Sequence, residues 1–162
     1  MRLSGILSPL PLISAKETNT HMKRTAQAHW QGDLKSGKGS LTSPSQVLNN
    51  TAYSFHTRFE NEHGTNPEEL LAAAHAGCFT MALSAQLANA GLTADSLDTT
   101  CTISLEKTEG GFSITGSHLD LQAKIPGATK EAFDTAVKAA ETGCPVSKLY
   151  KTAITVNAVL ES

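Results

Sequence analysis

The chain has 162 residues, of which 40% are hydrophobic and 17% are charged, a composition typical of one folded domain. The net charge of −2 gives no positive field for phosphates, and 5% aromatic residues offer few stacking platforms, which excludes a general nucleic-acid binder. Three cysteines are an odd number and few for a secreted disulfide scaffold. Reduced thiols in a cytoplasmic protein are therefore expected.

The first 21 residues, MRLSGILSPLPLISAKETNTH, are set apart from the rest. A basic residue followed by a short apolar run is faintly similar to a secretion signal, but two prolines interrupt the run. We interpret residues 1–21 as a disordered leader, an artificial extension, or translation from a start codon upstream of Met22. A single domain is expected over residues 22–162.

Short strands are predicted at the start of that domain. Apolar and polar residues alternate over 26–31, and a glycine-punctuated loop leads to a returning strand at 39–43. A further extended stretch is expected near Tyr53.

The strongest helix signal follows. Thr65 or Asn66 can cap a helix that begins at Pro67, an apolar run extends from 70 to 88, and Gly91 supplies the stop. This helix is apolar nearly all round, so we expect it to be buried rather than amphipathic. A membrane span is disfavoured because polar side chains interrupt a run that is mostly alanine.

The remaining chain alternates between strands and helices. Apolar alternation predicts strands, with a bulge near Gly116 where the parity of the apolar positions changes. Helix signals follow Thr129 and Cys144. The predicted strands are 101–105, 112–125 and 154–160, and the predicted helices are 130–142 and a short one opening at 144–147. The predicted fold is α+β, with antiparallel strands in hairpins packed on the long buried helix.

The cysteines differ in their predicted surroundings. Cys144 lies between a helix-stopping glycine and a proline, so it should sit at a helix N-terminus, which stabilises a thiolate. The alternative is a cysteine in the capping region with no chemistry. Cys78 lies in the middle of the apolar helix, where packing is the simplest role and burial would keep the thiol inert. Cys101 alternates with apolar strand residues and is expected to fill the core.

Arg58 and Glu68 are the other candidates, although each alone could be a surface charge or a helix-end residue. Glu68 and Cys78 are separated by about 15 Å along a straight helix. A site that uses both needs a long side chain such as that of Arg58, a bent helix start, or a second subunit. His75 neighbours Cys78 on the helix and could act as its base or, with Cys144, bind zinc. However, the sequence has no second pair of ligands at the spacing of a zinc site. A histidine that only packs in the core or lies on the surface is the simpler interpretation.

Four motifs resemble those of the OsmC/Ohr family of thiol peroxidases. They are TRFE at 57–60, GTNPEEL at 64–70, AAHAGCF at 73–79 and GCPVS at 143–147. The resemblance extends from about Ala26 to the C-terminus, and the valine after Cys144-Pro145 is more similar to the OsmC branch, named for osmotically inducible protein C. Cys101 and residues 1–21 are not part of the family pattern.

The resemblance implies an intertwined homodimer with both active sites at the subunit interface. It implies that Cys78 is the peroxidatic cysteine and Cys144 the resolving one. Arg58 would stabilise the Cys78 thiolate, and Glu68 would hold the arginine in place. Neither a cofactor nor a metal is implied.

The implied reaction reduces an organic hydroperoxide, and hydrogen peroxide more weakly, to an alcohol and leaves a sulfenic acid on Cys78. Cys144 would then form a disulfide, which an external dithiol, such as a lipoylated protein, would reduce. An apolar pocket lined by residues such as Leu71, Phe79 and Met81 would favour organic substrates. The role would be defence against oxidative or osmotic stress. Alternatives are a thiol redox sensor or small-ligand binder without turnover, and a metal-binding or purely structural protein.

Overall fold

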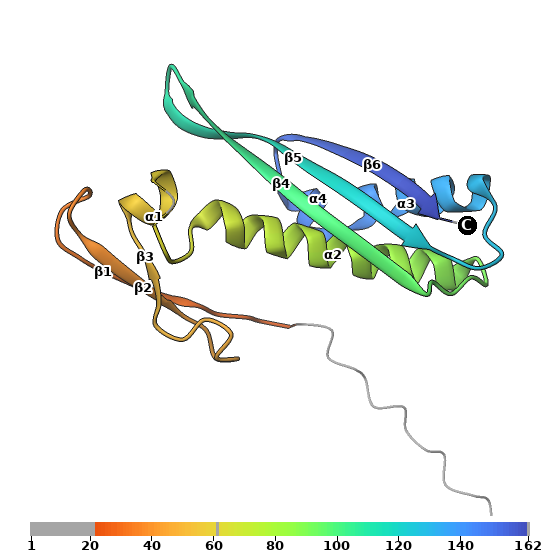
Figure 1. Cartoon of the computed structure of the whole chain (residues 1–162), viewed down its shortest axis with the longest axis horizontal. Helices are drawn as coiled ribbons and strands as arrows, with labels where there is room; N and C mark the ends of the chain where they lie inside the picture. Colours follow the sequence, from red (N-terminus) through yellow and green to blue (C-terminus); the bar gives the residue numbers. More distant parts are fainter. Residues whose placement is uncertain (1–21, 61, 162) are drawn as a thin grey trace, which may run out of the picture.

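The computed structural model describes residues 22–60 and 62–161, so the expectations for residues 1–21 lie outside the described part of the chain. The elements, in chain order, are β1 (Gln27–Gln31), β2 (Lys38–Thr42), β3 (Thr51–Tyr53), α1 (Phe55–Phe59), α2 (Pro67–Asn89), β4 (Ser96–Thr108), β5 (Gly111–Lys124), α3 (Lys130–Gly143), α4 (Pro145–Leu149) and β6 (Ala153–Glu161). The predicted mixture of helices and strands is confirmed. The strands form two small sheets (Figure 1).

The first sheet has the order β1-β2-β3, and both of its strand pairs are antiparallel. Trp30 on β1 packs against Tyr53 on β3, with ring centroids 5.4 Å apart. Figure 1 shows this sheet beside the N-terminal end of α2, away from the second sheet. The predicted strands at the start of the domain are confirmed, but sequence analysis missed α1, which follows them directly.

The second sheet has the order β4-β5-β6 and lies along α2 (Figure 1). β4 and β5 form the predicted hairpin, and the predicted bulge occurs where Ser104 pairs with Gly116 and Leu105 pairs with Ile114. The expectation of antiparallel strands throughout is wrong, because β6 runs parallel to β5. The helical segment from α3 to α4 connects these two strands, and a connection of this length allows the chain to return in the same direction.

The core lies between α2, α3 and the inner face of the second sheet. α2 begins where the sequence predicts, because the Asn66 side chain accepts a hydrogen bond from the Glu69 amide and Pro67 is the first helical residue. The expectation that α2 is buried all round is not met within this chain. One stripe, comprising His75, Phe79, Leu83 and Leu87, is buried, whereas Met81 on another face is 76% exposed.

By length and composition alone, α2 could cross a membrane, with a mean hydropathy of 1.4 in its most apolar window. This is a weak indication, because a core helix of a folded protein has the same properties. In this chain α2 carries a buried stripe packed on the second sheet, and its Thr80 hydroxyl bonds the Thr99 hydroxyl on β4 at 2.8 Å.

The one-sided burial of α2 leads to a prediction about the free energy of unfolding. Leu83→Ala should lower the free energy of unfolding by about 2–5 kcal/mol, because it empties a fully buried position. Leu34→Ala removes the same atoms from a side chain that is 71% exposed and should cost under about 1 kcal/mol. Urea unfolding of both variants measures the difference. Equal losses would show that the core is not where α2 meets the sheet.

Candidate active site

The structure brings Cys78 and Cys144 together. Cys78 lies in the middle of α2, and Cys144 lies in the N-cap position of α4, in the turn after α3. The two Sγ atoms are 2.6 Å apart, although 66 residues separate them in the chain. Cys144 is fully buried and Cys78 is partly buried, so the pair lies at the edge of the core.

The surroundings of the two thiols favour charge on Cys144. Burial and the hydrogen bond with Cys144 raise the pKa of Cys78. Burial opposes the thiolate at Cys144 as well. However, hydrogen bonds with Cys78 and with the backbone and hydroxyl of Ser147 outweigh burial and lower the pKa of Cys144. Within one chain, therefore, the surroundings favour the thiolate more at Cys144 than at Cys78.

Arg58 and Glu68 form a two-point ion pair, as their roles in the sequence analysis require. Arg58 Nε donates to Glu68 Oε2 at 3.0 Å, and Arg58 Nη2 donates to Oε1 at 2.6 Å. The guanidinium is thereby fixed in orientation by the first turn of α2. Much of the Arg58 side chain stays accessible, with 34% exposed, so the pair can still meet another group.

A local network places Arg58 opposite Glu68. Ser54 and Thr57 form a reciprocal capping box at the start of α1, a signal by which α1 could have been found in the sequence. The buried Thr57 hydroxyl also donates to the Thr65 carbonyl at 2.8 Å, which joins α1 to the segment before α2. Gly64 has φ +148° there, and a Cβ would lie 2.6 Å from the Ala52 carbonyl oxygen.

The structure does not bring the ion pair to the cysteines within one chain. Glu68 and Cys78 lie on the same continuous helix, about 15 Å apart along its axis. Among the described residues, Arg58 makes its side-chain hydrogen bonds with Glu68, and its guanidinium lies 5.4 Å from the centroid of the Phe59 ring. The four candidate residues thus form two separate pairs.

His75 is a buried histidine with both ring nitrogens engaged. Nδ1 lies 2.6 Å from the Ser117 hydroxyl on β5, and Nε2 lies 2.9 Å from the Ser147 hydroxyl on α4. Burial lowers its pKa, so the ring is neutral. Because neither nitrogen faces Cys78, the structure does not support His75 as a direct base for that thiol. Among residues 22–60 and 62–161, no cluster of three or more metal-binding side chains occurs.

Cys101 packs against the core, as expected, but it also belongs to a polar cluster. Its sulfur lies 3.3 Å from the Ser117 hydroxyl and 3.9 Å from His75 Nδ1. Burial raises the pKa of Cys101, with the hydrogen bond from Ser117 acting in the opposite direction. Sequence analysis missed Ser117. The signal for it was a serine at an inward, otherwise apolar position of β5, one residue after the bulge.

A shallow apolar groove lies beside α4. It has a volume of about 390 Å³ and is lined by Leu71, Ile114, Leu149, Tyr150, Lys151 and Thr152. Tyr150 connects it to the site, because its ring packs edge-on against His75 with the centroids 5.0 Å apart. Of the apolar pocket residues expected from the sequence, Leu71 lies here. Phe79 is instead fully buried in the core, and Met81 is exposed on another face of α2.

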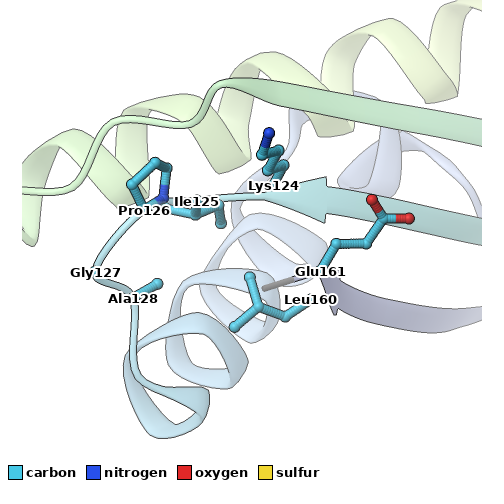
Figure 2. A pocket seen from close by; sticks show the side chains of 7 residues that line it. All are labelled: Lys124, Ile125, Pro126, Gly127, Ala128, Leu160 and Glu161. Carbon is cyan, nitrogen blue, oxygen red and sulfur yellow. The ribbon is translucent and has the colours of Figure 1, made fainter.

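A second pocket lies at the far end of the second sheet and contains no cysteine or histidine (Figure 2). Figure 2 shows Lys124 and Glu161 at the ends of neighbouring strands, above the turn that leads into α3. Its titratable lining residues are Lys124 and Glu161, and Lys124 forms an ion pair with Asp95. The chemistry of the described residues therefore concentrates around the two cysteines.

Comparisons with known proteins show which family the chain belongs to. A family model described as OsmC-like protein matches residues 59–159. The chain is 50% identical over 139 residues to peroxiredoxin OsmC of Escherichia coli strain K12, covering 86% of this chain and 97% of that protein. It is 31% identical over 111 residues to organic hydroperoxide resistance protein OhrB of Bacillus subtilis strain 168, covering 68% and 79% of the two chains.

The fold is shared as well. The crystal structure of OhrB from Bacillus subtilis matches with a TM-score of 0.61 at 28% identity, covering 85% of this chain and 98% of that one. The family model spans more than half of the sequence, and the chain is half identical to a relative of which it covers 97%. The chain therefore belongs to the family of OsmC-like proteins.

Proposed function

We propose that this chain is a thiol-dependent peroxidase that reduces organic hydroperoxides, and hydrogen peroxide more weakly, in defence against oxidative or osmotic stress. The observation that carries the proposal is the approach of Cys78 and Cys144 to 2.6 Å. Two thiols this close can form a disulfide with little movement. The names of the relatives, a peroxiredoxin and an organic hydroperoxide resistance protein, support the same chemistry.

In the proposed reaction, the Cys78 thiolate attacks the O–O bond of the hydroperoxide. An alcohol leaves after it takes up a proton, and Cys78 becomes a sulfenic acid. Cys144 then attacks the oxidised sulfur, which gives a disulfide and water. An external dithiol reduces the disulfide, and a lipoylated protein is our candidate for it. Such a cycle fits the reducing cytoplasm, where we place the protein.

We propose that the active unit is an intertwined homodimer and that a second copy, not a lipid bilayer, covers the bare side of α2. Within this chain, that side exposes Met81 together with small residues, namely Ala73, Ala74, Gly77, Ser84, Ala85 and Ala88. Small side chains allow two helices to approach closely, and apolar surface on a long helix calls for a partner. With the second copy in place, α2 becomes the buried central helix that its composition predicts.

The dimer also explains how Arg58 reaches Cys78. In our proposal, Arg58 of one subunit, held by Glu68, faces Cys78 of the other. Cys78 and Cys144 lie close enough to influence each other's ionisation, so a cation on one side decides which sulfur loses its proton first. Within one chain, the surroundings favour charge on Cys144. A guanidinium beside Cys78 reverses this preference and gives the nucleophile that the first step needs.

We propose that the substrate enters along the groove beside α4. Its walls are formed by Leu71, Ile114, Leu149 and Tyr150, and they offer an alkyl or aryl hydroperoxide an apolar surface at the end of α4, the helix that begins after Cys144. Hydrogen peroxide has no organic part to occupy this surface, so the groove favours organic hydroperoxides.

The two cysteines should respond differently to substitution. Cys78→Ser should abolish turnover of cumene hydroperoxide with a dithiol, because the nucleophile is lost. Cys144→Ser should consume one equivalent of hydroperoxide per chain and stop at a Cys78 sulfenic acid. Without a disulfide to protect it, this sulfenic acid is over-oxidised more easily than in the unmodified chain. Steady-state assays and mass spectrometry of the intact chain measure both. Cys101→Ser is the matched control and should keep turnover. Full activity of Cys78→Ser would refute the proposal.

The shared site can be tested by combining one impaired chain with one inactive chain. Arg58→Ala should slow peroxide reduction by about tenfold or more, since one charged hydrogen-bond donor is lost from the transition state. A purified heterodimer of an Arg58→Ala chain and a Cys78→Ser chain has one complete site if Arg58 acts across the interface. Its activity should be about half that of the unmodified dimer. Activity no higher than that of the Arg58→Ala homodimer would show that Arg58 does not act across the interface.

A further inference from the structure

The tip of the β4–β5 hairpin contacts α1, the helix that carries Arg58. Figure 1 shows the hairpin extending past the N-terminal end of α2, at the end of the molecule where α1 lies. The contact is made by Phe112, the second residue of β5, whose ring packs on the Phe59 ring with the centroids 5.1 Å apart. At this separation two aromatic rings attract each other. The proposed peroxidase cycle gives this contact no role.

Phe112 and Phe59 belong to an aromatic cluster on the surface. The third member is Phe55, one turn before Phe59 on α1, with the two ring centroids 4.8 Å apart. Within this chain Phe59 is 38% exposed and Phe112 is 58% exposed, so the cluster is not part of the core. Each ring is therefore held by its aromatic neighbours rather than by close packing on all sides.

The Phe59 ring also contacts Arg58. The guanidinium lies 5.4 Å from the centroid of the ring, within the distance at which a cation and an aromatic face attract each other. The Glu68 carboxylate binds two nitrogens of the same guanidinium, at 3.0 and 2.6 Å. The orientation of Arg58 thus depends on a carboxylate from α2 and on a ring that Phe112 contacts.

A helix as short as α1 needs such contacts at both ends, because five residues form few helical hydrogen bonds of their own. Near its N-terminal end, the Thr57 hydroxyl donates to the Thr65 carbonyl at 2.8 Å. Its last residue is Phe59, which the contact with Phe112 joins to the second sheet. Arg58 lies between these two points of attachment, so the hairpin tip helps to fix its position.

We propose that Phe112 is a positioning residue for Arg58: from the hairpin tip it holds the Phe59 ring, and the ring holds the guanidinium in the direction in which it meets Cys78 of the partner subunit. This proposal deepens the proposed function and rests on the role that Arg58 has there. A charged group stabilises a transition state fully only when it is held in place, and a small misplacement slows the reaction. Phe112 acts through Arg58 and touches no reacting atom.

The first test compares two substrates of the full chain as it assembles in solution. Phe112→Ala should lower kcat/KM for cumene hydroperoxide by about threefold to tenfold, as expected for the loss of one aromatic contact. It should lower kcat/KM for hydrogen peroxide by the same factor, because the guanidinium acts on the O–O bond that both substrates share. Phe112→Tyr keeps the ring and should retain the activity. Val159→Ala, at a 48% exposed position of β6 in the same sheet, is the matched control and should change neither value.

A second substitution shows whether the effect passes through Arg58. In a chain that already carries Arg58→Ala, Phe112→Ala should cause no further loss of kcat/KM, because the group that it positions is gone. Equal losses with and without Arg58 would overturn the proposal. A loss confined to cumene hydroperoxide would also overturn it, since Phe112 would then be a wall of the substrate site. An unchanged kcat/KM in a folded Phe112→Ala chain would do the same.

Hydrogen exchange at Arg58 Nε, followed by NMR, tests the positioning without peroxide. The bond to Glu68 should slow this exchange in the unmodified protein, and Phe112→Ala should speed it by about threefold or more. An unchanged exchange rate would overturn the proposal. Circular dichroism and size-exclusion chromatography show whether the variant keeps its fold and assembly. If it does not, Phe112→Leu, which keeps an apolar side chain at the hairpin tip, takes its place. Absence of turnover in the unmodified protein would refute the peroxidase function, and the exchange rate would still decide the claim about Phe112.

Discussion

The approach of two sulfurs that are distant in the sequence is the constraint on which the rest of the structure depends. Cys78 and Cys144 meet at 2.6 Å because α2 carries one sulfur into the core and the turn between α3 and α4 carries the other against it. The parallel return of β6 beside β5 requires a long connection, and this connection contains both α3 and α4. The unexpected strand direction and the meeting of the thiols thus have the same origin.

A single chain leaves this arrangement incomplete in two ways. One side of α2 is apolar and exposed, and the charged pair of Arg58 and Glu68 is held rigidly at a distance from the thiols. A second copy that covers α2 and presents Arg58 to Cys78 would answer both. In the proposed dimer, Arg58 would draw charge to Cys78 for the attack on peroxide, and Cys144 would then close the disulfide.

The sequence predicted those features that local interactions decide. The Asn66 cap and Pro67 set the start of α2, Thr129 caps α3 as expected, and the bulge near Gly116 follows from a change in alternation. The alternation of apolar and polar residues does not indicate in which direction a strand runs, so the parallel pairing of β6 was missed. The five-residue α1 is too short for a periodic signal.

The candidate site was predicted in part. The pairing of Cys78 with Cys144 came from the family resemblance, since spacing alone cannot bring together residues 66 positions apart. Composition predicted a helix buried all round, but one chain supplies packing for a single stripe. The contacts of His75 could not be predicted, because they depend on serines from β5 and α4 that only tertiary packing assembles.

The most direct test of the central claim is the product of a single oxidation. The fully reduced protein is treated with one molar equivalent of cumene hydroperoxide per chain. Thiol titration and peptide mapping then follow the three cysteines. Our account predicts the loss of two free thiols, one new disulfide between Cys78 and Cys144, and a Cys101 that stays reduced. Consumption of the hydroperoxide without that disulfide, or no consumption at all, would contradict it.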